Sequence, residues 1–146
     1  MFESLCAYVY ECCVKDAVIV FRILFAVCMG YIIGRERQRV KKSAGIRTHI
    51  IVCMSTAAVV AVSMQAFPEP DSGARAIAAV ITGIGFLGAG QIMTSQGKVS
   101  GITTAASIWT NALIGAVIGV GYYLVGFVAT MILYFTFRLR KGNVDD

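Results

Sequence analysis

Residues 105–135 read AASIWTNALIGAVIGVGYYLVGFVATMILYF, an uncharged and mostly apolar run. As one α-helix this run would be roughly 46 Å long at 1.5 Å per residue, whereas the hydrocarbon core of a bilayer is about 30 Å thick. The run is therefore too long for one crossing, and Gly119-Val120-Gly121 is the natural place for a break. We expect two helical spans here, over about residues 104–119 and 121–137.

Three further apolar stretches precede this run and are separated from one another by polar residues. They cover about residues 17–34, 50–67 and 76–94. Only 14% of the chain is charged and 58% is hydrophobic, whereas soluble domains have about 25% charged residues. The sequence therefore predicts an all-α membrane protein with about five short transmembrane helices in one domain, residues 17–137, and a short cytoplasmic tail, residues 138–146.

Two expectations concern what surrounds this domain. A chain of 146 residues builds only a small core, so membrane lipids and further copies of the chain, most simply in a homodimer, should cover its apolar faces. Residues 1–16 form a separate N-terminal outer segment in this interpretation. Phe2, Leu5, Val9 and Cys12 fall on one helical stripe there, which favours a short amphipathic helix on the outer surface.

The distribution of charge predicts the orientation in the membrane. Six of the thirteen Lys and Arg residues lie between positions 35 and 47, directly after the first span, and cytoplasmic loops collect such residues. Alternation then places residues 68–75 outside, Lys98 inside and the basic C-terminal tail inside. We therefore expect a multi-pass membrane protein with its N-terminus outside, its C-terminus in the cytoplasm and no nucleic-acid partner.

An internal repeat appears when the chain is shifted by 56 residues against itself. Residues 44–48, AGIRT, then align with residues 100–104, SGITT, and Gly34 aligns with Gly90. Two parallel helical-hairpin repeats followed by a final helix would explain this pattern; chance similarity between two glycine-rich loops is the alternative. In the repeat, Thr48 and Thr104 would cap helix N-termini. Together with Arg47 they would form a positive face for an anion, a lipid headgroup or an acidic partner, although capping and topology alone explain the same residues.

The glycines of the third span carry a pattern, GIGFLG over residues 83–88, that matches the dinucleotide-binding motif. That motif requires a strand before it and a helix after it, and here it lies in the middle of an apolar span. We instead expect these glycines to allow close packing of helices, as Gly30 with Gly34 and Gly115 with Gly119 would on other spans. A break of the third span into half-helices around a cavity is the functional alternative.

Polar groups inside the spans are few. Arg22 is either a functional intramembrane charge or a side chain that snorkels to the outer surface. Glu36 should pair locally with flanking arginines, and interhelical hydrogen bonds are expected for Ser107, Thr110 and Asn111 on one face of the fourth span. With His49 as the only histidine, no base–nucleophile spacing indicates catalysis. We expect no enzyme activity, cofactor or metal site. A pore lined by backbone carbonyls is the remaining alternative.

Four motifs in order give the chain a specific resemblance. They are GRER at residues 34–37, AGIRT at residues 44–48, TGIGFLGAG at residues 82–90 and GITTAASIW at residues 101–109. In these motifs the chain resembles the MgtC/SapB family of bacterial inner-membrane proteins.

The resemblance implies a non-enzymatic role linked to magnesium homeostasis, acid stress or virulence, exerted through contact with another membrane protein complex. A small transporter or channel, or a lipid- or anion-binding protein, are the alternatives. Many family members have Asn where this chain has Thr103, which puts the contact at that position in question. With Asn111 added from the polar face, the candidate functional residues are Arg22, Arg35, Glu36, Arg47, Thr48, Gly83, Gly85, Gly88, Gly90, Thr103, Thr104 and Asn111.

Overall fold

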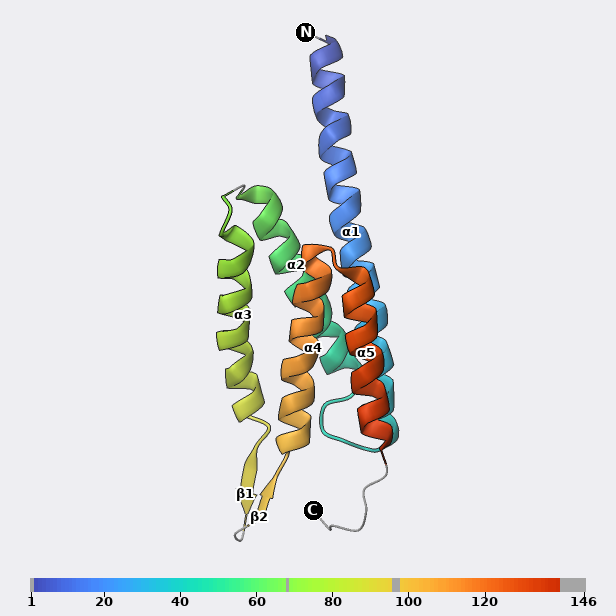
Figure 1. The fold of residues 1–146 in the computed structure, drawn as a ribbon, viewed down its shortest axis with the longest axis vertical. Helices are drawn as coiled ribbons and strands as arrows, with labels where there is room; N and C mark the ends of the chain where they lie inside the picture. Colours follow the sequence, from blue (N-terminus) through green and yellow to red (C-terminus); the bar gives the residue numbers. More distant parts are fainter. Residues whose placement is uncertain (1, 68, 96–97, 140–146) are drawn as a thin grey trace.

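The computed structural model describes residues 2–67, 69–95 and 98–139, with side chains from residue 10 onward. This part of the chain forms five α-helices and one two-stranded β-hairpin (Figure 1). The elements in order are α1 (Phe2–Arg39), α2 (Ile46–Ala66), α3 (Ser72–Ala89), β1 (Met93–Ser95), β2 (Lys98–Ser100), α4 (Ile102–Val120) and α5 (Tyr123–Arg138). The predicted five-helix fold is confirmed.

Helix α1 is longer than the first expected span. It has 38 residues, or roughly 57 Å at 1.5 Å per residue. We expected a break between residues 16 and 17, and the helix is instead continuous across it. No proline interrupts residues 2–39, and Glu11 and Lys15 form an (i, i+4) ion pair with 2.7 Å between Oε1 and Nζ, which favours helix on both sides of the expected break. The side chains of Phe2, Leu5 and Val9 lie outside the described residues.

The break in the long apolar run occurs where the sequence predicts it. Helix α4 ends at Val120, and Gly121 has φ of +113°, in the left-handed region. Glycine adopts this conformation without steric cost, and its N–H bonds back to the carbonyls of Val117 and Ile118. Helix α5 starts two residues later and returns along the bundle, so one apolar run forms an antiparallel helix pair.

The third span is shorter than expected, because a β-hairpin follows it. We expected helix to residue 94, but α3 ends at Ala89. Strand β1 then pairs antiparallel with β2, with Met93 opposite Ser100 and Ser95 opposite Lys98. Gly101 closes the connection with φ of +88°, and a Cβ there would collide with the carbonyl oxygen of Gln91. Because Gly45 has φ of −108°, the two aligned loops differ in structure, and the internal repeat stays a prediction.

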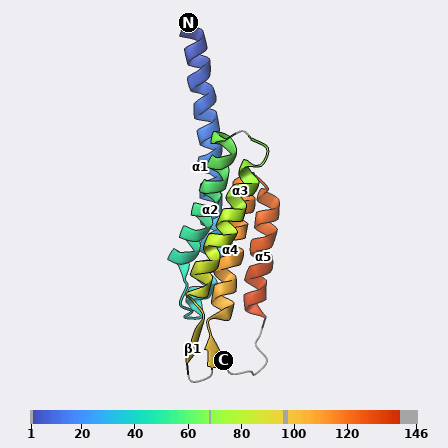
Figure 2. The same ribbon diagram turned by 90° about the vertical axis from the view of Figure 1, so that its left-hand side faces the viewer.

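Helices α2 and α4 form the centre of the bundle, with α3 along one side and α1 and α5 along the other (Figures 1 and 2). One apolar cluster joins α1, α2 and α4 through Ala26, Met29, Cys53, Ala57, Ile114 and Ile118. A second joins α3 to α2 and α4 through Ile84, Val52, Ile108 and Ala112, together with Ala44 of the first loop.

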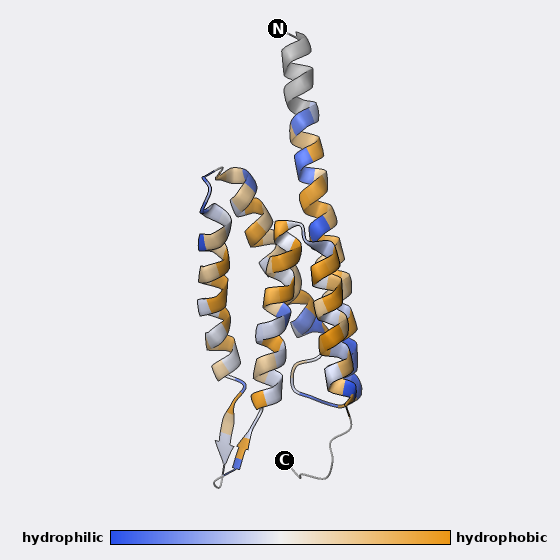
Figure 3. Cartoon of the chain, viewed as in Figure 1, coloured by the Kyte–Doolittle hydropathy of each residue, from blue (hydrophilic) through white to orange (hydrophobic). Residues whose placement is uncertain are grey.

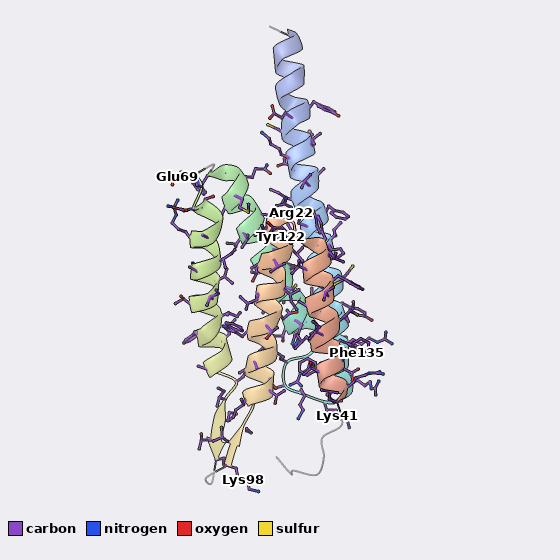
Figure 4. The ribbon with its side chains drawn as sticks, in the orientation of Figure 1. Arg22, Lys41, Glu69, Lys98, Tyr122 and Phe135 are labelled. Carbon is purple, nitrogen blue, oxygen red and sulfur yellow. The ribbon has the colours of Figure 1, made fainter. Side chains whose placement is uncertain are left out.

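The loops lie at two ends of the bundle. Lys41 and Lys98 share one end, which we call the basic end, and Glu69 lies at the opposite end with Tyr122 and Arg22 (Figure 4). Apolar residues dominate the helices between these ends (Figure 3). Four described helices, α1 to α4, are long and apolar enough to cross a membrane, whereas α5 is apolar but shorter, with 16 residues. The architecture is that of a multi-pass membrane protein.

Candidate functional site

Arg37 is the centre of a polar network buried near the basic end. It lies in the last turn of α1 and is only 3% exposed. Its Nη2 donates a hydrogen bond of 2.7 Å to Oγ1 of Thr104 in α4, and its guanidinium lies 4.8 Å from the centroid of the Phe137 ring in α5. A buried charge is costly unless it is paired or hydrogen-bonded, so these contacts fix α1, α4 and α5 to one another at this point.

Glu36 is the neighbour of Arg37 and is also buried. We expected it to pair with the arginines beside it in the sequence, Arg35 and Arg37. Its carboxylate oxygens instead lie 3.7 Å from Nη1 of Arg39 and 3.7 Å from Nε of Arg138. Successive residues of a helix point in different directions, whereas residues three apart share a face. Glu36 therefore joins the end of α1 to the last turn of α5.

His49 extends the network into α2. Its side chain is fully buried; Nδ1 lies 2.9 Å from the carbonyl oxygen of Gly45, and Nε2 lies 3.3 Å from Oγ of Ser107 in α4. The Ser107 hydroxyl donates to the carbonyl of Thr104 at 2.7 Å. Because the carbonyl oxygen of Gly45 can only accept a hydrogen bond, Nδ1 of His49 carries the proton in their contact. The imidazole thus connects the first loop to the helix that also binds Arg37.

Asn111 lies one helical turn from Ser107 and is fully buried. Its Nδ2 donates to the carbonyl of His49 at 2.7 Å, while its Oδ1 has no hydrogen-bond partner among the described residues. The expected interhelical hydrogen bonds of the fourth span are therefore confirmed for Ser107 and Asn111. The amide leaves one acceptor available inside the bundle, where an unpaired carbonyl costs about 1–3 kcal/mol.

The expected capping by threonines is wrong. The N-cap residues of α2 and α4 are Gly45 and Gly101, without a side-chain cap, so Thr48 and Thr104 lie in the first helical turn. Thr104 is buried and uses its hydroxyl as the acceptor for Arg37. Thr48 is exposed at the basic end. Arg35, Arg47 and Thr103 are likewise exposed there.

The glycines of α3 do not pack as expected. A Cβ at Gly83 or Gly85 would meet nothing within 4 Å, and one at Gly88 would only touch Ala105 at 3.9 Å. Gly90 lies beyond the end of α3, against carbonyls of its own helix. The close packing expected for the other glycine pairs is confirmed: a Cβ at Gly30 or Gly34 would lie 2.6 Å from α2 backbone atoms, and Gly115 and Gly119 also contact α2.

Arg22 lies at the opposite end from the network. Its Nη1 donates a hydrogen bond of 2.6 Å to the carbonyl of Gly119, near the end of α4, where carbonyl groups lack intrahelical partners. Its Nε is buried and has no partner among the described residues. We expected either a functional charge or a side chain that snorkels to the surface, and the guanidinium instead turns toward α4 (Figure 4).

The sequence alone does not identify two members of the network. Arg37 falls in the basic cluster after the first span, and His49 is a lone histidine with no partner indicated by spacing. Their partners are far away in the sequence: Arg37 bonds Thr104, and His49 meets Ser107. The spacing of Thr104, Ser107 and Asn111, three and four residues apart, is the one available signal, because it places all three on one face of α4.

Membrane-length helices around a buried polar network define an α-helical, multi-pass membrane protein. A model of the MgtC family matches residues 23–143. The chain belongs to the MgtC family, as the four sequence motifs indicate.

Several curated relatives support this assignment. The chain is 40% identical over 135 residues to protein SrpB of Synechococcus elongatus, covering 84% of this chain and 72% of SrpB. It is 38% identical over 139 residues to the putative magnesium transporter YhiD of Escherichia coli K12, covering 85% and 65%. It is 40% identical over 114 residues to protein MgtC of Salmonella typhimurium LT2, covering 78% and 48%. The chain thus spans about half to three quarters of these relatives. No solved structure matches it significantly.

Proposed function

We propose that this protein is a non-enzymatic regulator in the bacterial inner membrane that acts in magnesium homeostasis by contacting another membrane protein. The link to magnesium comes from relatives, one of which is called a putative magnesium transporter. The geometry of this chain favours two contact surfaces for a partner protein, one on a membrane-spanning helix and one at the basic end.

The main support for this proposal is that some motif residues point into the bundle and others point out of it. Glu36 and Thr104 point into the bundle and contact other helices there, and the candidate residue Asn111 does so through its Nδ2. Gly83 and Gly85 have open space where a side chain would be. Small residues let helices approach closely in lipid, where packing drives association. The open face of α3 is therefore suited to a transmembrane helix from outside this chain.

The basic end supplies a second contact surface beside the first. Arg35, Arg47 and Thr103 are exposed there, together with Lys41 and Lys42 of the first loop. Positive residues that lie just outside a membrane attract acidic protein segments and anionic headgroups. A partner that places a helix against α3 and an acidic segment on this end would use both surfaces.

The interior gives transport less support. Mg²⁺ prefers several oxygen ligands in octahedral geometry, and the described residues contain no cluster of three or more His, Cys, Asp or Glu. Glu36 is held between two arginines. The unpaired Oδ1 of Asn111 and the name of the E. coli relative favour a small transporter as the second candidate.

Co-purification of a partner with wild-type and variant chains tests the proposed regulatory function. The tagged full chain is purified from native membranes as wild type, Gly85→Leu and Ala79→Leu, and co-purifying proteins are quantified. Ala79 is exposed on another face of α3, so it receives the same bulk as a control. We expect a stoichiometric partner whose yield falls about tenfold, or about 1.4 kcal/mol, only in Gly85→Leu. Equal recovery in the two variants would contradict the proposal.

Liposome flux separates the two candidates. The purified chain is reconstituted alone, and Mg²⁺ entry is followed with an enclosed indicator dye. The regulator predicts no entry above that of empty liposomes. Entry that disappears in Asn111→Ala would instead establish the transporter.

Crosslinking from Gly85 identifies which protein lies against the open face of α3. In a background whose native cysteines are changed to alanine, Gly85→Cys is oxidised in membranes and analysed by mass. We expect a mixed disulfide or a crosslink with another protein; a product of twice the chain mass would show that a second copy occupies this face.

Impermeant thiol labelling tests the proposed orientation. In the same background, Asp71→Cys should react in intact cells, because its loop is expected outside. Ser43→Cys should react only after the cells are opened, and the reverse pattern would invert the topology.

A further inference from the structure

Helix α1 carries one continuous inward stripe that changes character along its length. Near the middle of the bundle this stripe is apolar and buried, with Ala26 fully buried. Toward the N-terminus the same helical spacing brings Arg22, Ile19 and Lys15 onto it, at intervals of three and four residues. The face that packs against α2 below thus becomes partly cationic above.

Helix α2 leaves α1 where the stripe becomes cationic. Figure 1 shows its upper end leaning toward α3 and away from α1. The divergence opens a groove of about 650 Å³ between residues 15–22 of α1 and residues 61–66 of α2. Lys15, Asp16 and Arg22 supply its charges, Gln65 is polar and uncharged, and Ile19 and Val62 are apolar. The side of the groove contributed by α2 has no charged residue to neutralise the cations.

Arg22 holds the deep end of the groove. Its hydrogen bond to Gly119 uses Nη1, whereas its Nε is buried without a partner among the described residues. Lys15 lies two helical turns higher and pairs with Glu11, but both side chains of that pair are more than half exposed. Exposed pairs of this kind are worth little and exchange readily. An incoming anion therefore meets the guanidinium of Arg22 in the groove wall and the exposed ammonium group of Lys15.

Aromatic side chains place this groove at the membrane interface. Phe21 and Phe25 pack edge-on against Tyr123, with ring centroids 5.4 and 5.5 Å apart, and Tyr122 is exposed beside them in the α4–α5 connection. Tyr side chains collect at the level of lipid headgroups. A ligand at this depth has its polar group among the headgroups and its apolar part toward the hydrocarbon.

We propose that this groove is a binding site for a glycerophospholipid of the surrounding bilayer, held through its phosphate by Arg22 and Lys15. The part of its acyl chain nearest the headgroup lies against Ile19 and Val62. Among the residues that line the groove, the cations Lys15 and Arg22 outnumber the single carboxylate of Asp16 by one, and the phosphate replaces Glu11, which lies outside the lining, as the partner of Lys15. The site lies at the opposite end from the basic surface and is independent of the proposed regulatory contact.

Native mass spectrometry of the full chain in detergent tests this site. The probes are phosphatidylglycerol, diacylglycerol with the same acyl chains, and inorganic phosphate. We expect one phosphatidylglycerol to be retained, diacylglycerol to be lost and inorganic phosphate to give no adduct. Equal retention of the two lipids would overturn the role of the phosphate, and displacement of phosphatidylglycerol by millimolar inorganic phosphate would overturn the lipid as the occupant.

Charge changes at Gln65 test whether the lipid binds in the groove. They should not disturb the fold, because this side chain is exposed. Gln65→Glu should weaken retention about fivefold and Gln65→Lys should strengthen it by a similar factor, as about 1 kcal/mol per charge requires. Arg75→Gln, at the same end but outside the groove, is the control. Equal retention in both Gln65 variants would overturn the site, and this outcome holds even if Arg22→Gln fails to fold.

Discussion

Helices α3 and α4 are similar in length and rich in glycine, yet Gly83 and Gly85 of α3 and Gly115 and Gly119 of α4 have opposite surroundings. A Cβ at Gly119 in α4 would lie 2.7 Å from the carbonyl oxygen of Ala57, and one at Gly115 would collide with that of Cys53. A Cβ at Gly83 or Gly85 in α3 would have nothing within 4 Å. Glycine in a membrane helix is therefore not by itself a sign of close packing within the same chain.

Burial follows the same division. In the most apolar window of α4, 61% of the residues are buried inside the chain, against 22% in α3. Helix α4 also carries Thr104, Ser107 and Asn111, whose side chains bond α1, α2 or its own backbone. Substitutions in α4 should therefore affect folding, whereas substitutions at the exposed Gly83 and Gly85 of α3 should affect only contacts with other molecules.

Gly115→Leu should have the largest effect. The new side chain would occupy the position of the α2 backbone at Cys53, and backbone cannot move aside as a flexible side chain can. We expect a loss of at least about 3 kcal/mol, seen as an aggregated elution profile and a lost thermal transition of Trp109 fluorescence in detergent. A folded Gly115→Leu protein with wild-type melting would contradict the close helix contact.

Thr104→Val should be the next largest. It keeps the shape of the side chain but removes the acceptor of the Arg37 guanidinium, which leaves a buried charged donor without this partner. We expect a loss of about 2 kcal/mol in unfolding free energy, measured by denaturant titration in mixed micelles. Thr103→Val changes the exposed neighbour and should change stability by less than about 0.5 kcal/mol; similar losses in both variants would remove the network from the explanation.

Asn111→Ala should have a smaller effect, since it removes one neutral hydrogen bond to the His49 carbonyl. Interhelical hydrogen bonds in membrane proteins contribute about 0.6 kcal/mol on average, and the deleted Oδ1 was itself unpaired. We expect a loss of about 1 kcal/mol from the same titration. On α3, Thr82→Ala removes a bond within its own helix and should be near neutral. A larger loss for Thr82→Ala would reverse the contrast between the helices.

Gly85→Leu should have the smallest effect on stability. Its side chain enters open space, and leucine favours helix by up to about 1 kcal/mol over glycine. We expect an unchanged or slightly raised melting temperature together with the loss of the partner described above. A clear drop in melting temperature would mean that α3 packs within the chain more tightly than its glycines indicate.

Much of the fold follows from residues that act locally. The turn between α4 and α5 was predictable because Gly121 is one of the few residues that adopts positive φ freely. The hairpin after α3 was not, because Met93 and Thr94 follow directly on an apolar run, and the polar stretch from Ser95 to Gly101 reads equally well as a loop. The continuation of α1 across residues 16 and 17 does not follow from the apolar pattern, because charged residues precede the apolar run, although an (i, i+4) pair between Glu11 and Lys15 supports helix.

The candidate site was only partly predictable, for a different reason. The face of α4 with Ser107 and Asn111 follows from helical spacing within one element. The assignment of Arg37 to this face and of Arg22 to Gly119 depends on how distant helices dock. For the same reason the sequence grouped the glycines of α3 with those of α1 and α4, although only tertiary packing distinguishes them.

The shared carboxylate of Glu36 has a consequence for how the chain is made. Translation delivers Glu36 and Arg39 to the membrane long before Arg138, so the acid first has a single cationic partner three residues away. The second partner arrives only when the final helix has inserted and folded back. Arrival of Arg138 therefore gives the buried carboxylate a second cationic contact, and the ion pair between α1 and α5 is the later of the two to form.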